Sequence, residues 1–251
     1  MAKGSNIYFA SDFHLGSPID YDNHDRERKV VRWLDSISAD AKAIYLLGDV
    51  FDFWFEYKHV VPKGHVRLLG KLAQLSDEGI ELRIFTGNHD VWMFDYFEKE
   101  LGAKVYGEPI SIEQFNMKLL VGHGDGLGPG DEGFKMIKKV FTNRLAQRCF
   151  AALHPYIGVS LAQFFSRKSR ETTGHKDSIY MGDDKEFLVQ FCLDTLKEKH
   201  YDCFIFGHRH MVLDKTLPNN SRYINLGEWF STCNYAKLSK ECGLELLAFE
   251  G

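Results

Sequence analysis

The chain has 251 residues, of which 44% are hydrophobic and 26% are charged, a composition ordinary for a globular protein. This length suits one large α/β domain, or one domain with a sizeable insertion. No stretch approaches the ~20 apolar residues of a membrane span, and the apolar run Ile7 to Ala10 is too short for a signal peptide. The five cysteines show no CxxC spacing. We therefore expect reduced thiols and a cytoplasmic location.

Charge is distributed unevenly along the chain. The formal net charge is only -4, so the average does not indicate a nucleic-acid-binding protein. Residues 134–176 nevertheless carry nine Lys or Arg and one acidic residue, a local charge of +8. A positive charge of this size on one segment bears on which partners the protein binds.

Hydrophobic periodicity predicts strands and helices in alternation. In chain order they are a strand at Ile7–Ala10, a helix at 24–38, a strand at 43–47, a helix around 65–76, a strand at 82–86, strands near 110–115 and 117–121, two amphipathic helices near 131–150 and 156–168, a helix at 184–199, a strand at 203–206, and strands near 222–226 and 243–249. This order indicates an α/β fold with at least one parallel sheet. We predict a single domain over residues 1–251 with a helical insertion at about 131–176.

Five of the predicted strands end in a short polar cluster. The clusters supply Asp12 and His14, Asp49, Asn88, His123, and His208 with His210. Ligands of open α/β sheets bind beyond the carboxyl ends of strands, so these side chains should converge. Asp12 and His14 are two residues apart, and on an extended segment both would leave on one face.

These residue types are typical of a metal site. An isolated His near a strand end is usually a surface or core residue, but five clusters after five buried strands favour metal binding. Carboxylates, imidazoles and one amide oxygen suit Mn²⁺, Fe or Zn²⁺, and of these we expect Mn²⁺. Seven ligands exceed the need of one ion. Two ions ~3.5–4 Å apart are a known device for phosphoryl displacement.

The same residues resemble the five ordered motifs of calcineurin-like metallophosphoesterases. The motifs are Asp12-x-His14, Gly48-Asp49-x-x-Asp52, Gly87-Asn88-His89-Asp90, Gly122-His123 and Gly207-His208-x-His210. The resemblance implies two mixed sheets packed face to face, a four-layer αββα sandwich with a helical lid. It also implies that one ion takes Asp12, His14 and His210, that the other takes Asn88, His123 and His208, and that Asp49 bridges them.

Two residues beside Asn88 are candidates for catalytic roles. His89 is adjacent to a predicted ligand, and it is placed to steady the transition state or to protonate the leaving oxygen. Asp90 is expected to accept a hydrogen bond from the His89 ring and fix its tautomer. Asp90 is alternatively the N-cap of a helix that begins at Val91.

The insertion is rich in apolar and basic residues. One interpretation is a helical cap with a solvated basic face. The other is a lid that takes acyl chains inside, while its cations meet phosphate or an anionic membrane surface.

The insertion also resembles the lid of one branch of the family, the UDP-2,3-diacylglucosamine diphosphatases of lipid A synthesis in Gram-negative bacteria. These enzymes cleave a pyrophosphate to UMP and an acylated glucosamine 1-phosphate. The segment 169–176 is similar to their substrate-binding segment, which implies roles for Ser169, Arg170 and Lys176. The aromatic run 51–55 is implied to line the mouth of the site. One departure is His89, where well-known members have Arg.

The expected substrate is therefore an acylated UDP-sugar, with peripheral contact at the inner membrane and no nucleic-acid partner. The alternative is a phosphodiesterase or phosphatase acting on another nucleotide or phosphoester. Such an enzyme would have no use for an apolar, basic lid. A nuclease would need aromatic stacking platforms among the cations, whereas the apolar residues here have core-like spacing. A non-catalytic scaffold would not require His89.

Overall fold

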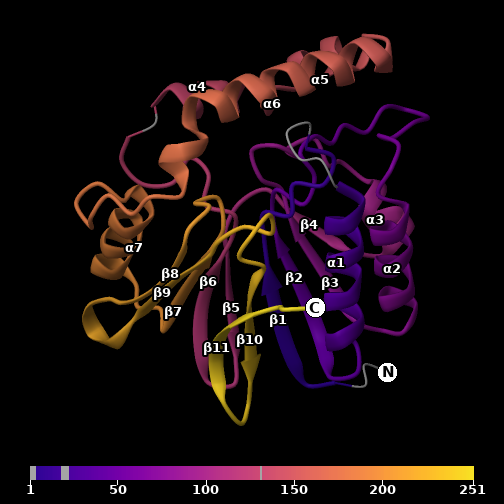
Figure 1. Ribbon diagram of the computed structural model, residues 1–251. Coiled ribbons are helices and arrows are strands. Elements are labelled where there is room, and N and C mark those ends of the chain that lie inside the picture. The colour runs from indigo at the N-terminus through magenta and orange to yellow at the C-terminus, as the bar shows by residue number, and fades with distance from the viewer. Residues whose placement is uncertain (1–3, 18–22, 131) are drawn as a thin grey trace.

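The computed structural model describes residues 4–17, 23–130 and 132–251, without the side chains of residues 133, 134 and 169–177. Two sheets lie face to face, and helices cover their outer sides (Figure 1). No described helix has the length and apolar character needed to cross a membrane.

The first sheet has six strands in the order β11-β10-β1-β2-β3-β4. Their bounds are β1 (Asn6–Ala10), β2 (Ala41–Leu47), β3 (Glu81–Phe85), β4 (Lys104–Tyr106), β10 (Asn234–Ser239) and β11 (Gly243–Ala248). The four strands β1 to β4 are parallel, β10 pairs antiparallel with β1, and β11 pairs antiparallel with β10. The carboxyl ends of β1, β2 and β3 therefore lie at one rim.

The second sheet has five strands in the order β5-β6-β7-β9-β8. Their bounds are β5 (Ile110–Gln114), β6 (Met117–Val121), β7 (Cys203–Phe206), β8 (Val212–Thr216) and β9 (Arg222–Leu226). The strands β6, β7 and β9 are parallel, and β5 and β8 pair with them in the antiparallel sense. Both sheets thus present parallel-strand ends toward the top of the molecule in Figure 1.

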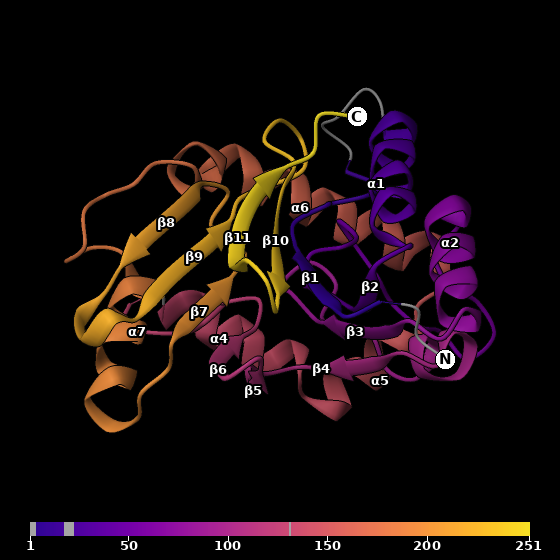
Figure 2. The ribbon, with the colours of Figure 1, turned by 90° about the horizontal axis from the view of Figure 1, so that it is seen from below.

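Period-two alternation in β1 separates two apolar layers. Ile7 and Phe9 face the layer between the sheets, whereas Tyr8 and Ala10 face the helices. Those helices are α1 (Asn23–Ile37), α2 (Val66–Asp77) and α3 (Tyr96–Leu101), while α7 (Phe187–Glu198) packs on the other sheet. Figure 2 shows α1 and α2 on one side of the paired sheets and α7 on the other. The predicted four-layer αββα class is confirmed.

Three helices cross the top of the sandwich, and we call them the lid. They are α4 (Glu132–Phe141), α5 (Arg144–Ala151) and α6 (Pro155–Asp177). The prediction of two helices is wrong because Asn143 interrupts the first. Its backbone is extended, and its side chain accepts hydrogen bonds from the backbone of Leu145 and Ala146, as an N-cap does. The division into one domain over residues 1–251 stays a prediction.

Candidate metal centre

All seven predicted ligands lie at one rim of the sandwich, beneath the lid. The first sheet supplies Asp12 and His14 after β1, Asp49 after β2 and Asn88 after β3, and the second sheet supplies His123 after β6 and His208 and His210 after β7. The structure therefore brings together residues up to 198 positions apart in the chain.

One half of the site gathers around Asp12. The Nε2 atoms of His14 and His210 lie 3.0 Å apart. They lie 3.6 and 3.5 Å from Oδ1 of Asp12. With metal–ligand bonds of about 2.1 Å, ligand atoms around one ion are separated by about 3–3.5 Å. These three atoms therefore fit one cation.

The other half gathers around Asn88. Its Oδ1 lies 3.2 Å from Nε2 of His123 and 2.9 Å from Nδ1 of His208. Asp49 lies between the halves, because its Oδ2 is 3.6 Å from Nε2 of His14 and 3.4 Å from Nε2 of His123. This carboxylate therefore lies beside imidazoles of both halves.

Hydrogen bonds to the protein orient these side chains. Nδ1 of His123 lies 2.8 Å from the carbonyl oxygen of Leu47, so Nδ1 donates a proton to that oxygen and Nε2 is the ring nitrogen that faces the site. The backbone N–H of His208 donates to Oδ2 of Asp12 at 3.0 Å. Outer contacts of this kind are what fix metal ligands in place.

The backbone at the site is left-handed at several ligands. Asp12, His14, Asp49 and His208 have φ between 45° and 66°, a region that residues other than glycine rarely occupy. The prediction that Asp12 and His14 share a face of an extended segment is therefore wrong, although both reach the site. The left-handed conformation of each such residue lowers the stability of the fold by about 1–3 kcal/mol. Strain of this kind is typical of functional sites.

Two glycines make room for the carboxylates. A Cβ atom at position 87 would overlap the Asp49 carboxylate, and one at position 207 would overlap that of Asp12. Neither Gly87 nor Gly207 has a positive φ. Glycine is therefore required at both positions because the ligands approach so closely.

The electrostatics of the site favour cations. Burial raises the pKa of Asp49, but His123, His89 and His14 outweigh burial and hold this pKa well below its ordinary value. Burial lowers the pKa of His123, but Asp49 outweighs burial and raises this pKa to about 10. Burial, together with the charge on His123, lowers the pKa of His208 to about 4. The ionised Asp49 carboxylate thus holds a proton on the His123 imidazole, and a metal ion would supply the same positive charge.

A buried atom of Asp12 also points to a cation. Its Oδ1 is buried and has no hydrogen-bond partner among the described residues. An unsatisfied buried carboxylate oxygen is costly. The Nε2 atoms of His14 and His210 lie 3.6 and 3.5 Å from it, so the donor set fits a divalent ion that binds all three atoms.

The structure corrects the predicted surroundings of His89. Nδ1 of His89 lies 3.2 Å from the carbonyl oxygen and 3.7 Å from the Oδ1 atom of Asp52. The Asp90 carboxylate instead accepts backbone hydrogen bonds from Gly87, Asp49 and Phe51. Asp52, and not Asp90, therefore holds the His89 ring.

Asp90 connects two loops of the site. Burial and the charge of Asp49 raise the pKa of Asp90 to about 7. The N-cap interpretation is also wrong, because residues 91–94 form no helix and α3 begins at Tyr96. Asp90 binds the loop after β3 to the loop after β2, and both loops carry predicted ligands.

Two further residues at the site were not predicted. Oδ2 of Asp52 accepts a hydrogen bond from the hydroxyl of Ser166 in α6. The Phe230 ring stacks on His14, with ring centroids 5.7 Å apart, and the Arg26 guanidinium lies 4.3 Å from its centroid. The spacing Gly48-Asp49-x-x-Asp52 pointed to Asp52, whereas no sequence pattern distinguished Ser166 or Phe230.

Aromatic packing holds the lid on the sandwich. The Phe150 ring of α5 lies 4.6 Å from Trp92 and 4.8 Å from Phe55 between centroids. Nε1 of Trp92 donates to the carbonyl oxygen of Phe141 at 2.8 Å. Within the run 51–55, Phe51 and Trp54 are fully buried in the helix-side core, and Phe53 lines the cavity described next. The implied role of the run at the mouth therefore applies to Phe53.

A cavity of about 660 Å³ lies between the sandwich and α6. Its lining begins at Leu15 and Gly16, directly after His14, and at Phe53, directly after Asp52. The lid contributes residues between Pro155 and Gln163, and the loop 57–65 forms another wall. This volume is within the ~300–1,000 Å³ of small-molecule sites.

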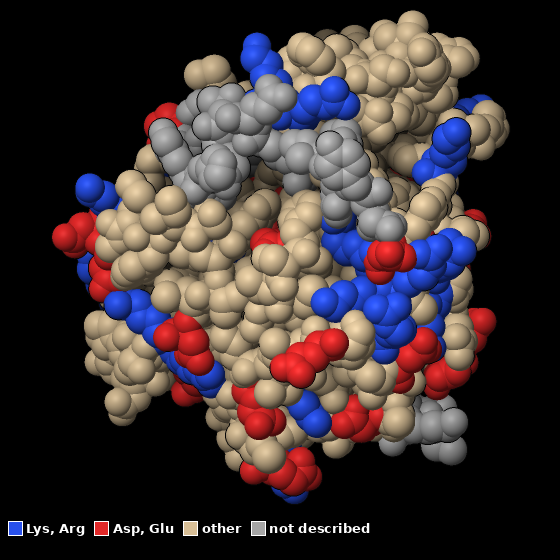
Figure 3. Space-filling view, viewed as in Figure 1, with Lys and Arg blue, Asp and Glu red and all other residues tan. Residues whose placement is uncertain are grey.

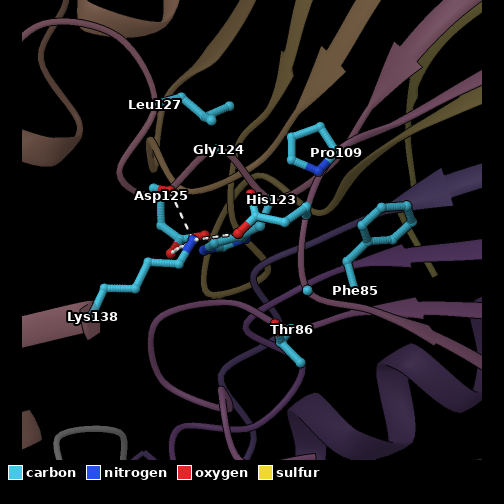
Figure 4. Close-up of a pocket in the computed structure, with 10 residues that line it drawn as sticks. Phe85, Thr86, Pro109, His123, Gly124, Asp125, Leu127 and Lys138 are labelled. Atoms are coloured by element: carbon cyan, nitrogen blue, oxygen red, sulfur yellow. Dashed lines mark hydrogen bonds and ion pairs between the residues drawn. The ribbon is translucent and has the colours of Figure 1, made fainter. Parts of the chain in front are cut away.

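An ion pair fixes α4 beside the second half of the site. Nζ of Lys138 lies 2.9 Å from Oδ2 of Asp125 and donates to its carbonyl oxygen at 3.3 Å (Figure 4). Asp125 follows His123 by two residues. Lys135 likewise donates to the carbonyl oxygen of Gly128 at 2.8 Å. Two of the basic lid residues therefore anchor the lid instead of facing outward.

The predicted substrate-binding residues lie at the end of α6. Ser169, Arg170 and Lys176 belong to this helix, but their side chains lie outside the described residues.

Comparison with known proteins defines the class. The calcineurin-like phosphoesterase family matches residues 5–212, and the chain belongs to this family, as predicted. It is thus a hydrolase acting on phosphate bonds, and its clustered Asp and His residues indicate a divalent metal site.

Two relatives of the chain share one enzyme name. The chain is 41% identical to the UDP-2,3-diacylglucosamine hydrolase of Porphyromonas gingivalis, covering 92% of this chain and 93% of that protein. It is 29% identical to the enzyme of the same name from Aeromonas hydrophila, over 88% and 90% of the two chains. Among solved structures, Yfce, a phosphoesterase from E. coli, aligns with a TM-score of 0.48 and 13% identity over 98% of this chain and 94% of that one.

Proposed function

We propose that the protein is a dinuclear-metal hydrolase that cleaves the pyrophosphate of UDP-2,3-diacylglucosamine to UMP and 2,3-diacylglucosamine 1-phosphate. The observation that carries the proposal is the cavity beneath α6, which begins beside His14 and has room for apolar chains. The names of the two relatives support the same substrate.

Seven side chains would hold two ions. Asp12, His14 and His210 would bind one, and Asn88, His123 and His208 the other. Asp49 would bridge them, since its Oδ2 faces imidazoles of both halves. We propose Mn²⁺, and Fe or Zn²⁺ also suit these ligands.

The reaction adds water to one phosphorus atom and breaks its bond to the bridging oxygen of the pyrophosphate. When bound, the ions lower the pKa of water and offset negative charge on phosphoryl oxygens. His89 faces two acceptor atoms of Asp52 with its Nδ1. That contact orients the ring with a proton on Nδ1, and the opposite ring nitrogen, Nε2, is proposed as the atom that gives a proton to the leaving oxygen.

At the lid, Ser169, Arg170 and Lys176 are proposed to bind the substrate. Their hydroxyl and cationic groups suit the phosphoryl or sugar part, while the acyl chains occupy the cavity under α6. Val159 of α6 lines this cavity.

Contact with an anionic membrane surface is proposed for the outer side of the lid. Several apolar lid residues are strongly exposed, among them Leu145 and Tyr156, at 69% and 77%. Figure 3 shows few charged atoms over α5 and the start of α6. Arg144 and Arg148 of α5 are exposed and make no ion pair with a described residue. Apolar residues flanked by cations are typical of interfacial helices.

The test compares three substrates with the Mn²⁺-loaded protein. UDP-2,3-diacylglucosamine should release UMP far faster than UDP-N-acetylglucosamine, which lacks the chains, or an aryl phosphodiester. Equal slow turnover of all three would favour the alternative, a phosphodiesterase or phosphatase for another phosphoester.

A cavity-filling variant sharpens the test. Val159→Trp should raise KM for the acylated substrate at least ten-fold, because it takes up space that the chains need. The matched control is Val140→Trp on α4, where the side chain is 53% exposed and lies outside the cavity lining. Equal KM values for both variants would exclude this cavity as the acyl site.

A further inference from the structure

His65 has a strained backbone at the start of α2. Its φ is 56° and its ψ is 16°, and its side chain makes no hydrogen bond to the first turn of the helix. The Glu27 carboxylate of α1 instead accepts the backbone N–H groups of Arg67 and Leu68, at 3.0 and 3.1 Å. A residue other than glycine is uncommon at this φ, and α2 does not need His65 as its cap.

The His65 ring contacts two loops that carry proposed metal ligands. Its centroid lies 4.8 Å from that of Phe51, in the loop after β2, and the two rings meet edge to face. A Cβ atom added to Gly16, in the loop after β1, would lie 3.2 Å from Cε1 and 3.4 Å from Nε2 of His65. Gly16 follows the proposed ligand His14 by two residues, and both Gly16 and His65 line the cavity under α6. His65 therefore lies in the part of the cavity wall that adjoins the metal centre.

The ring nitrogens of His65 have no hydrogen-bond partner within the described part of the chain, although the side chain is partly buried. Burial lowers the pKa of His65 to about 4. The ring is therefore neutral at neutral pH and offers one N–H donor and one acceptor. A ligand that fills the cavity displaces water from these atoms, so it must supply their partners itself.

The cavity lining combines this polar group with apolar ones. Val60, Val61 and Val159 suit acyl chains, whereas His65 offers hydrogen bonds beside the loop after β1. In the proposed substrate, the sugar and its amide and ester links lie between the pyrophosphate and the chains. A ligand with its phosphoryl groups at the metal centre and its chains in the cavity would therefore bring a link carbonyl to His65.

We propose that His65 is a substrate-binding residue that forms a hydrogen bond to the carbonyl group linking an acyl chain to the sugar. The proposal deepens the proposed function, since it rests on the substrate class given there. The imidazole N–H donates, and the amide or ester carbonyl oxygen accepts. This contact recognises the link of an acylated substrate, whereas the apolar lining recognises only the chain.

The first experiment needs no variant and no nucleotide. N-octanoylglucosamine and octyl glucoside carry chains of the same length, but only the first links its chain through an amide carbonyl. The ¹⁵N ring signals of His65 are followed in the Zn²⁺-loaded protein, because Zn²⁺ is diamagnetic. We expect N-octanoylglucosamine to shift these signals and octyl glucoside to leave them nearly unchanged. Equal shifts with both probes, or no shift with either, would overturn the proposal.

The second experiment compares His65→Leu with His65→Asn. Asparagine tolerates the left-handed backbone and keeps a donor and an acceptor, whereas leucine has neither. The readout is kcat/KM for UDP-2,3-diacylglucosamine divided by kcat/KM for an aryl phosphodiester. This ratio should fall about ten-fold in His65→Leu, which corresponds to ~1.4 kcal/mol and to a carbonyl left without its donor. His65→Asn should recover most of the ratio.

The matched control is His59→Leu. His59 is exposed in the same loop and lies outside the described cavity lining, so the ratio should stay native. A native ratio in His65→Leu would contradict the proposal, and so would an equal fall in both His65 variants, since that is an effect of shape alone. If a His65 variant does not fold, as its thermal unfolding shows, the probe titration of the native protein decides.

The two proposals fail in different ways. If the native protein does not cleave UDP-2,3-diacylglucosamine, the proposed function fails. The two probes contain no nucleotide and no phosphoryl group, so the His65 ring signals still decide whether this residue binds an acyl link.

Discussion

Replacing His89 by alanine removes the proposed proton donor and leaves all the proposed metal ligands in place. The backbone N–H of His89 donates to Oδ1 of Asp49 at 2.9 Å, and alanine keeps this bond. The ring contacts Asp52 and the edge of His14, and one of its nitrogens lies within 4.8 Å of a carboxylate oxygen of Asp49. Its side chain is 15% exposed. The variant should therefore fold and bind metal like the native protein.

The expected loss follows from the role of the ring. General acid catalysis contributes about 10²–10⁴-fold, so kcat should fall by that factor while KM changes little. The loss should be larger for a substrate with a more basic leaving group, because such a group needs the proton more. If the ring only supplied positive charge, the two losses would be equal.

The assay measures kcat on phenyl and p-nitrophenyl phosphodiesters and metal content by mass spectrometry. His200→Ala is the matched control, since the His200 side chain is 52% exposed and its Nε2 lies 3.4 Å from Asp202. Native kcat in His89→Ala would refute the assignment. A fall in kcat that tracks metal loss would show that His89 supports the metal site instead.

Three further changes test other parts of the structure. Asp90→Asn should lower the free energy of unfolding, measured by urea titration, by about 1–3 kcal/mol. The new amide group faces a backbone N–H donor and leaves that donor without an acceptor. Unchanged stability would exclude the role of Asp90 in joining the two loops. Asp49→Ala should abolish hydrolysis and lower the metal content measured by mass spectrometry, and retained turnover would contradict the bridging role. Phe150→Ala should loosen the lid, because the half-buried Phe150 ring loses its packing, at a cost below the about 3–5 kcal/mol of a fully buried Phe. Hydrogen–deuterium exchange in α5 should rise, and native exchange rates would show that the aromatic cluster does not hold the lid.

The strands that carry the site were predictable because they are buried. β1, β2, β3, β6 and β7 are short and largely apolar, with charged residues in β2, β3 and β6, and each is followed within two residues by a Gly, Asp, Asn or His cluster. Buried strands leave a continuous apolar pattern, and the predicted bounds agree with the observed ones to within two residues. The gathering of the seven side chains follows from parallel strands that share a rim.

The elements that were missed lack such a pattern. β8 is an edge strand whose residues alternate between exposed and half-buried, and β4 is only three residues long. β10 begins with Asn234 and contains Lys237, so its sequence does not indicate a strand. Edge and short strands depend on partners far away in the chain, and local sequence does not contain that information.

The details of the site depend on tertiary contacts. The left-handed backbone of Asp12 and His14 is imposed by hydrogen bonds to the loop after β2, where His14 donates its N–H to the carbonyl oxygen of Asp49 at 2.9 Å. The partner of His89 could not be read from spacing, since the predicted partner was the adjacent Asp90, whereas the observed one, Asp52, lies 37 positions earlier in the chain. Only the fold shows that Asp90 turns toward backbone amides.

The ligand sets also explain why the site lies where the two sheets meet. Asp12 and His14 come from the first sheet and His210 from the second, and the other proposed set likewise combines Asn88 with His123 and His208. Each ion would thus join both sheets at the rim, above an apolar layer that holds them together below. Because only the folded chain brings these ligands together, metal binding should stabilise the native state. The fold tolerates the strained backbone at four ligands because the packed sheets beneath the rim supply free energy of folding that offsets the cost of the strain.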